Sequence, residues 1–223
     1  MILAPQGRAR FHQMVQRLAS ETGGIALTEF ALSLPLLIIL TASGLELSNY
    51  VSATKRVGDL AAMVADNASR MGMRSAGLSV HQVSEAEIND VFTGAELQAD
   101  LQAFNEHGRI ILSSLQRNAD DGQWIAWQRC FGNNGIGPRF GMEGDGASGT
   151  SFPGMGPQDR RVQAPRGTAV MFVEVSYNYQ PIFPVLSFPA ATLQEIAVFN
   201  VRESRDLTMP RNPENVEISS CDA

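Results

Sequence analysis

Residues 24–47 read GIALTEFALSLPLLIILTASGLEL, and this stretch decides the fold. Sixteen consecutive residues, 30–45, carry no charge, and Glu29 alone interrupts the apolar run when it is extended back to Ile25. A helix over 25–45 would rise roughly 30 Å, the thickness of a bilayer core. A core helix of a soluble protein would show a polar stripe, and the leucine-rich run leaves no room for one. The sequence therefore predicts a membrane-spanning helix.

Charge on the two sides of this helix predicts its orientation. Residues 1–24 carry three arginines and one glutamate, whereas the chain after residue 48 carries a net charge of −6. By the positive-inside rule, residues 1–24 form a cytoplasmic leader and everything after about Ser48 is exported. We therefore expect a single-pass inner-membrane protein with a periplasmic domain. The acidic main body argues against a nucleic acid as partner, because phosphate binding needs clustered positive charge.

The sequence after the apolar run continues as a helix. A cleaved secretory signal is the competing interpretation, but it would end in a small-residue cleavage site and a polar mature start. Residues 49–71 instead place apolar side chains at spacings of three and four. One helix over 25–71 would be roughly 70 Å long, half in lipid and half outside as a stalk. Pro35 lies at mid-membrane and is expected to kink it.

The junction between leader and apolar run holds GIALTEF (residues 24–30), of the form G-x-x-x-x-E-F. It resembles the processing site of tight-adherence (Flp, type IVb) prepilins, which a membrane aspartyl peptidase cuts after the glycine. The continuation EFALSLPLLIILTASGLEL resembles TadE-like minor pseudopilins, including the proline at position 35 and the acidic residue after the run. The specific resemblance covers about residues 22–70, and AVMFVEVSYNYQPIF (169–183) resembles the same family less specifically. Ile25, where type IVa pilins have phenylalanine, favours the tight-adherence branch.

The resemblance implies roles for four residues of this motif: Gly24 and Ile25 in processing, and Glu29 and Phe30 in assembly. Gly24 has no side chain, so an active site can approach its backbone closely. Cleavage there would leave a new amine on Ile25, mostly protonated at neutral pH. In pilins the glutamate at the position of Glu29, next to Phe30, pairs with a neighbour's N-terminus and sets the stagger of assembly. The alternative for Glu29 is an interfacial carboxylate whose head reaches water.

The exported part, residues 72–223, is predicted to be an α+β domain. A helix opens at Ser84, whose spacing to Glu87 is that of a capping box, and Gly94 is expected to end it. A second short helix is expected over 95–104. With the stalk, the domain would have the lollipop shape of pilins. The expected strands form an antiparallel sheet against the stalk's outer half and this helix, and they cover residues 109–116, 123–130, 169–179 and 193–202.

Two further segments and two cysteines complete the domain. Residues 131–165 are rich in glycine and proline and are predicted to be a long surface loop, too poor in apolar residues to make a core. Residues 206–223 are expected to be an irregular tail. In an oxidising periplasm, Cys130 and Cys221 are expected to form a disulfide, worth roughly 4 kcal/mol for a loop of about 90 residues. Two free thiols are the alternative.

Signs of catalysis are missing from the sequence. The three histidines are scattered, and no nucleophile elbow, zinc-binding helix or phosphate loop is present. Glu143 and Asp145 could suggest calcium, but they lack the alternation of a calcium-binding loop. Glu85 and Glu87 are more simply the start of a helix. We expect neither an enzyme nor a cofactor or metal site.

These observations favour a structural assembly role over a catalytic one. The resemblance implies a minor pseudopilin of a tight-adherence pilus or related secretion apparatus. Its partners would be other pilin or pseudopilin subunits, the membrane assembly platform, the prepilin peptidase and the lipid bilayer. Two alternatives stay open: a membrane-anchored periplasmic enzyme or sensor, and a TadG-like envelope protein with an adhesion domain.

Overall fold

The computed structural model describes residues 23–74, 81–184, 191–202 and 206–221. Most of the predicted leader, including its arginines, lies outside the described residues. The chain divides into two compact units, Met1–Ser48 and Asn49–Ala223. Each unit is described by itself below.

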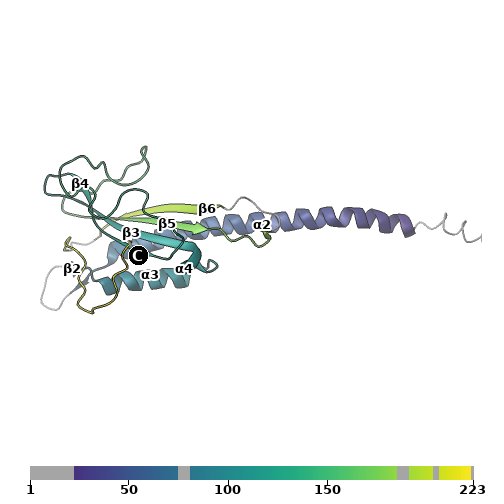
Figure 1. Cartoon of the computed structure of the whole chain (residues 1–223), viewed down its shortest axis with the longest axis horizontal. Helices are drawn as coiled ribbons and strands as arrows, with labels where there is room; N and C mark the ends of the chain where they lie inside the picture. Colours follow the sequence, from purple (N-terminus) through teal and green to yellow (C-terminus); the bar gives the residue numbers. More distant parts are fainter. Residues whose placement is uncertain (1–22, 75–80, 185–190, 203–205, 222–223) are drawn as a thin grey trace, which may run out of the picture. The chain divides into compact units, whose positions relative to one another are not determined.

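A single long helix, α2 (Gly23–Arg70), carries the apolar run and continues into the second unit. Its bounds agree closely with the helix predicted over 25–71. Pro35 lies inside it. Because a proline lacks the backbone N–H, it removes one bond to the preceding turn; the kink itself stays a prediction. The helix appears in purple and blue in Figure 1.

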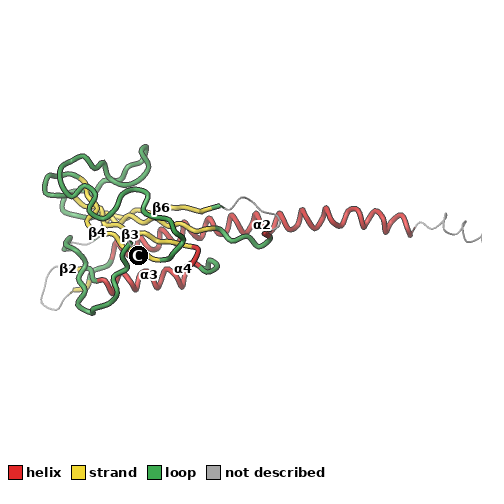
Figure 2. Tube along the Cα trace, in the orientation of Figure 1, coloured by secondary structure: helices red, strands yellow, loops and turns green. Residues whose placement is uncertain are grey.

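The second unit is built on a four-stranded antiparallel sheet with the strand order β4-β3-β5-β6. Its strands lie where the sequence predicted them to within two residues, and the α+β prediction is confirmed. Figure 2 shows them in yellow beside the red helices. A separate pair, β1 (Met73–Arg74) with β2 (His81–Gln82), was not predicted. The strands of the sheet are β3 (Gly108–Arg117), β4 (Gln123–Phe131), β5 (Val170–Asn178) and β6 (Thr192–Asn200).

Helix α3 (Glu85–Ala99) begins as predicted, with a complete capping box between Ser84 and Glu87. The prediction that Gly94 ends it was wrong, because the helix runs five residues further. Glycine inside a helix costs about 1 kcal/mol relative to alanine, and burial of Ala95 and Ala99 offsets this cost. The prediction of a separate short helix over 95–104 was wrong: residues 95–99 belong to α3, and the single turn α4 (Phe104–His107) begins where that helix was expected to end.

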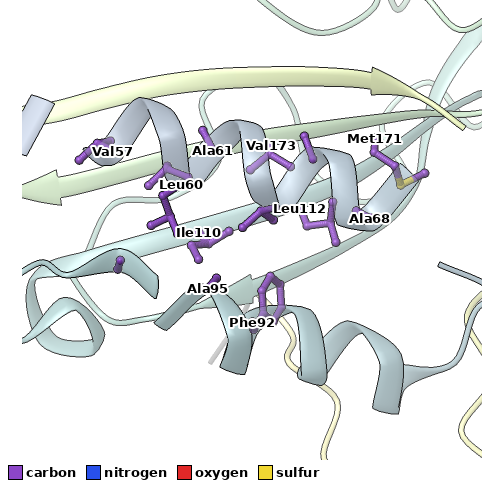
Figure 3. Packing of buried hydrophobic residues seen from close by; sticks show 14 of the residues in the cluster. Val57, Leu60, Ala61, Ala68, Phe92, Ala95, Ile110, Leu112, Met171 and Val173 are labelled. Atoms are coloured by element: carbon purple, nitrogen blue, oxygen red, sulfur yellow. The ribbon is translucent and has the colours of Figure 1, made fainter. Parts of the chain in front are cut away.

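The main core lies between one face of the sheet and the two helices α2 and α3. Figure 3 shows Val57 and Leu60 of α2, Phe92 and Ala95 of α3, and Ile110 of β3 converging there. Inward residues recur at every third or fourth position on the helices and at alternate positions on the strands, as their periods of 3.6 and 2 require. The sequence predicted this packing.

The opposite face of the sheet carries a second core that the sequence did not predict. Residues 132–167 form no long regular element, as expected, but they are not merely a surface loop. Met155 is fully buried, and Phe140 and Phe152 are partly buried beside it. The apolar side chains are few, but turns at glycines such as Gly154, with φ of 97°, direct them onto the sheet. They pack against the outward residues of three strands, Leu115, Ile125, Val170 and Phe172.

The C-terminal tail is irregular in secondary structure but firmly attached. The Arg211 N–H donates to the Val83 carbonyl at 2.9 Å, and the Cys130 N–H donates to the Ser219 carbonyl at 2.8 Å. The predicted disulfide between Cys130 and Cys221 is present, with a sequence separation of 91. The tail therefore runs from the start of α3 to the outer edge of β4.

Candidate functional site

The motif GIALTEF (residues 24–30) occupies the first two turns of α2. Gly24 is helical, and a Cβ built on it would meet nothing within 4 Å. Neither backbone conformation nor packing among the described residues therefore requires a glycine there.

Ile25 and Glu29 lie one helical turn apart, so their side chains share one face. The apolar side chains of the motif are exposed: Ile25 is 60% and Phe30 is 59% exposed. Among the described residues, no hydrogen bond or ion pair reaches the Glu29 carboxylate. The structure of one copy thus brings the motif residues onto one short helical segment but gives Glu29 no partner of its own.

Helix α2 is long and apolar enough to cross a membrane. None of the residues in an apolar stretch of 18 residues of this helix is buried. Hydroxyl groups in the motif and in the apolar run after it bond to the preceding turn of the helix. The hydroxyls of Thr28 and Thr41 donate to the carbonyls of Ile25 and Leu37, each at 2.8 Å. Such bonds to the preceding turn let hydroxyls enter hydrocarbon without an unpaired donor. An exposed apolar surface of this length is unfavourable in water and consistent with single-pass membrane anchoring.

The comparison with known families falls on this helix. A family model described as TadE-like protein matches residues 24–74. Residues 24–74 are therefore a TadE-like segment. The match begins at the glycine of the motif and supports a place for the chain in the tight-adherence pilus system. The rest of the second unit lies outside it, and no curated protein or solved structure matches the chain.

Beyond the TadE-like segment, the second unit holds a buried ion pair that the sequence did not reveal. Arg129 of β4 donates to Glu85 at the start of α3 at 2.5 and 2.9 Å, and both side chains are almost fully buried. Burial lowers the pKa of Arg129, but Glu85 and Glu143 raise it by more, so it lies above its ordinary value. Glu85 is therefore more than a helix start.

The acidic residues weighed as calcium ligands have other partners. Glu143 accepts from the Gln128 N–H at 2.8 Å and from Arg129 at 3.0 Å. Asp145 accepts from the Met142 N–H at 2.8 Å. The Glu143 carboxylate thus holds the 132–167 segment against β4, whereas the Asp145 carboxylate stabilises a turn within the segment.

Glu174 on β5 is the most perturbed carboxyl group among the described residues. It faces the second core side of the sheet and is 6% exposed. One carboxylate oxygen accepts from the Arg139 N–H at 3.1 Å, and the other, Oε1, has no hydrogen-bond partner. Burial raises the pKa of Glu174 to about 7, although the Arg139 N–H and guanidinium act to lower it. No sequence pattern indicated this, because an alternating strand residue is ordinarily assigned to solvent.

Proposed function

We propose that this protein is a minor pseudopilin, a structural subunit of a tight-adherence pilus or a related secretion apparatus. The observation that carries the proposal is the G-x-x-x-x-E-F motif at the start of an exposed, membrane-length helix in the TadE-like segment. The helix anchors the chain in the inner membrane. The leader is cytoplasmic, and the domain of residues 72–223 is periplasmic.

In this proposal, a prepilin peptidase cuts the chain between Gly24 and Ile25. The open space around Gly24 supports this cleavage site, because an enzyme can reach a backbone that no side chain covers. The cut creates a charged amine on Ile25 at the edge of the lipid. Glu29 of one subunit pairs with the Ile25 amine of another, which fixes the axial position of neighbouring helices.

The experiment that tests the assembly role replaces Glu29. In a strain lacking this protein, we expect the Glu29→Leu variant to insert and be cleaved normally but to fail to restore pili and surface adherence. Removing one partner of a desolvated charge pair costs about 3–5 kcal/mol, which weakens association more than about a hundredfold. Glu29→Asp, one methylene shorter, should be intermediate.

Thr28→Leu is the matched control, since it adds the same side chain at the same depth and keeps the carboxylate. It should support pili at near wild-type levels. If the helix were only a tether, Glu29→Leu would be neutral or improve insertion, because a charge near lipid is unfavourable. Wild-type piliation by Glu29→Leu, at normal protein level, would therefore refute the assembly role of this residue.

A further inference from the structure

The strand β6 (Thr192–Asn200) forms an open edge of the sheet, in contrast to the edge at β4. The outer side of β4 is covered: Ile125 donates to Asp145, and Cys130 donates to Ser219, at 3.0 and 2.8 Å. Among the residues that the structure describes, β6 pairs only with β5, over nine residues and without a bulge. Exposed edges are normally protected by lysine, proline or bulges. β6 has no lysine, proline or bulge, and its one charged residue is Glu195.

The register shows which backbone groups of β6 point outward. Tyr179 donates to Ala191, and Val201 donates to Ala169, each at 3.0 Å, so these pairs at both ends are hydrogen-bonded pairs. Hydrogen-bonded and non-hydrogen-bonded pairs alternate along an antiparallel ladder. The odd-numbered residues of β6 therefore bond to β5. The groups left for a further strand are the N–H and C=O of Thr192, Gln194, Ile196, Val198 and Asn200.

The same residues line a groove beside this edge. Gln194, Ile196 and Val198 line a groove of about 400 Å³, together with Phe172 of β5 and Val162 of the 132–167 segment. Its charged lining residues are Arg139, Arg160 and Glu195. Arg160 is paired with Asp159 at 3.3 Å, whereas Arg139 makes no ion pair within the described part of the chain. The groove thus combines apolar side chains with two arginines against one glutamate, a net positive lining that attracts a carboxylate.

We propose that the β6 edge and this groove bind an extended segment of another protein by strand addition. The segment has apolar side chains at alternate positions, which enter the groove, and an acidic residue that meets Arg139. Backbone hydrogen bonds supply binding, and the groove supplies selectivity, as in other cases of strand addition. The inference deepens the proposed assembly role and rests on it for the location of the partner in the envelope.

A second copy of β6 is the other occupant to consider. β6 runs in the same direction as the outer half of α2, since Gly58 lies beside Glu195 and Asp66 pairs with Arg202. In a symmetric antiparallel β6 pair, the two α2 outer halves would run in opposite directions. Their N-terminal ends, from which the chain continues into the membrane span, would then lie at opposite ends of the pair. A separate extended segment places no such constraint on the direction of α2, so we take it as the occupant.

The test is a binding measurement on the full chain in detergent, so it can fail independently of piliation. The probe is the peptide acetyl-EVTVTVE-amide, with acetyl-KVTVTVK-amide as the charge control. We expect saturable binding of one acidic peptide per chain, with weaker binding of the lysine peptide. Residue-resolved amide exchange should slow at Gln194, Ile196 and Val198. The amides of Glu195 and Ala197, already bonded to β5, should change little.

Two variants at one position separate strand addition from general adhesion. Gln194→Pro removes an outward N–H that β5 does not use, and should weaken binding about fivefold or more, as expected for the loss of one hydrogen bond. Gln194→Ala removes the same side chain but keeps the N–H, and should bind about fivefold or more tightly than Gln194→Pro. No saturable binding, equal binding by both variants, or protection outside β6 would overturn the proposal. Concentration-dependent protection without peptide would also overturn it, because it would identify a second copy as the occupant.

Discussion

At the residue scale, Glu174 shows how tertiary burial changes a side chain that looks ordinary in the sequence. It alternates with apolar residues along β5, which is the pattern of a strand with one solvent-exposed face. The 132–167 segment instead covers that face, so the carboxyl group is desolvated and one oxygen lacks a partner. A carboxyl group held this way favours its neutral form.

The resulting prediction concerns stability against pH. The folded pKa of Glu174, about 7, lies above its unfolded value of 4.5, so the folded state binds the proton more tightly. Its contribution is therefore fully present below the unfolded pKa and is lost as pH rises toward the folded pKa. Glu174→Gln should raise the free energy of unfolding at pH 8 by up to about 3 kcal/mol and flatten its fall between those two pKa values. Denaturant unfolding of both proteins across this range measures it, and parallel pH profiles would contradict it.

Gly24 is the residue at which processing can be tested directly. We expect the mature protein to begin at Ile25, and we expect Gly24→Arg to prevent the cut by filling the space that the backbone needs in the peptidase. The same substitution should leave the fold unchanged, because a side chain there meets nothing within 4 Å. Intact mass of the membrane-extracted protein, in strains with and without the peptidase, is the measurement. A mature wild-type chain that retains residues 1–24 would contradict the expectation.

At the element scale, the 132–167 segment is the main departure from the sequence-based expectation. Counting apolar residues classified it as a surface loop, and it has no long strand or helix. That prediction considered only the segment's own apolar residues. The face of the sheet beneath the segment also carries apolar residues, including Ile125 and Phe172, and these complete the core. A few well-placed side chains suffice when a preformed sheet supplies the rest.

Met155 tests whether this second core stabilises the domain. Its side chain is fully buried, with no accessible surface. Met155→Ala should therefore lower the free energy of unfolding by about 2–4 kcal/mol. Met142 belongs to the same segment but is 62% exposed, and Met142→Ala should change that free energy by less than about 0.5 kcal/mol. Urea unfolding followed by tryptophan fluorescence compares the two. Equal effects would mean that the segment is a surface loop after all.

At the scale of the whole molecule, the C-terminal tail ties together elements that are distant in sequence. Arg211 bonds to the entry of α3, the Leu207 carbonyl accepts from Gln116 of β3 at 3.0 Å, and Cys221 is bonded to β4. The disulfide closes a long loop that contains β5 and β6, two of the four strands of the sheet, so it restricts the unfolded chain strongly.

Removing the disulfide should therefore destabilise the second unit as a whole. We expect the double variant Cys130→Ser, Cys221→Ser to lose roughly 4 kcal/mol of unfolding free energy, the value for a loop of this length. Wild-type protein unfolded in reductant should match the variant, which controls for the serine side chains. Complete alkylation of both thiols without prior reduction would show instead that the protein carries free cysteines.

The helices and strands were largely predictable because the formation of each is governed by residues that are close together in the sequence. The unbroken apolar run of α2, the capping box at Ser84 and the β-rich stretches at β3 and β5 are local patterns, and the structure reproduces them. Gly94 misled the prediction because the helix propensity of one residue is weaker than the burial of those after it. The motif at residues 24–30 was visible for the same local reason.

What the sequence by itself determined is thus the membrane-length helix, its TadE-like start and the existence of four strands. Only the tertiary structure decided the buried pair of Arg129 with Glu85, the raised pKa of Glu174 and the open edge at β6. The physical reason is that burial and pairing belong to contacts between residues far apart in the chain. A carboxylate is a helix start, a buried partner or an unpaired acid according to what the fold places against it, and no local pattern records that neighbour.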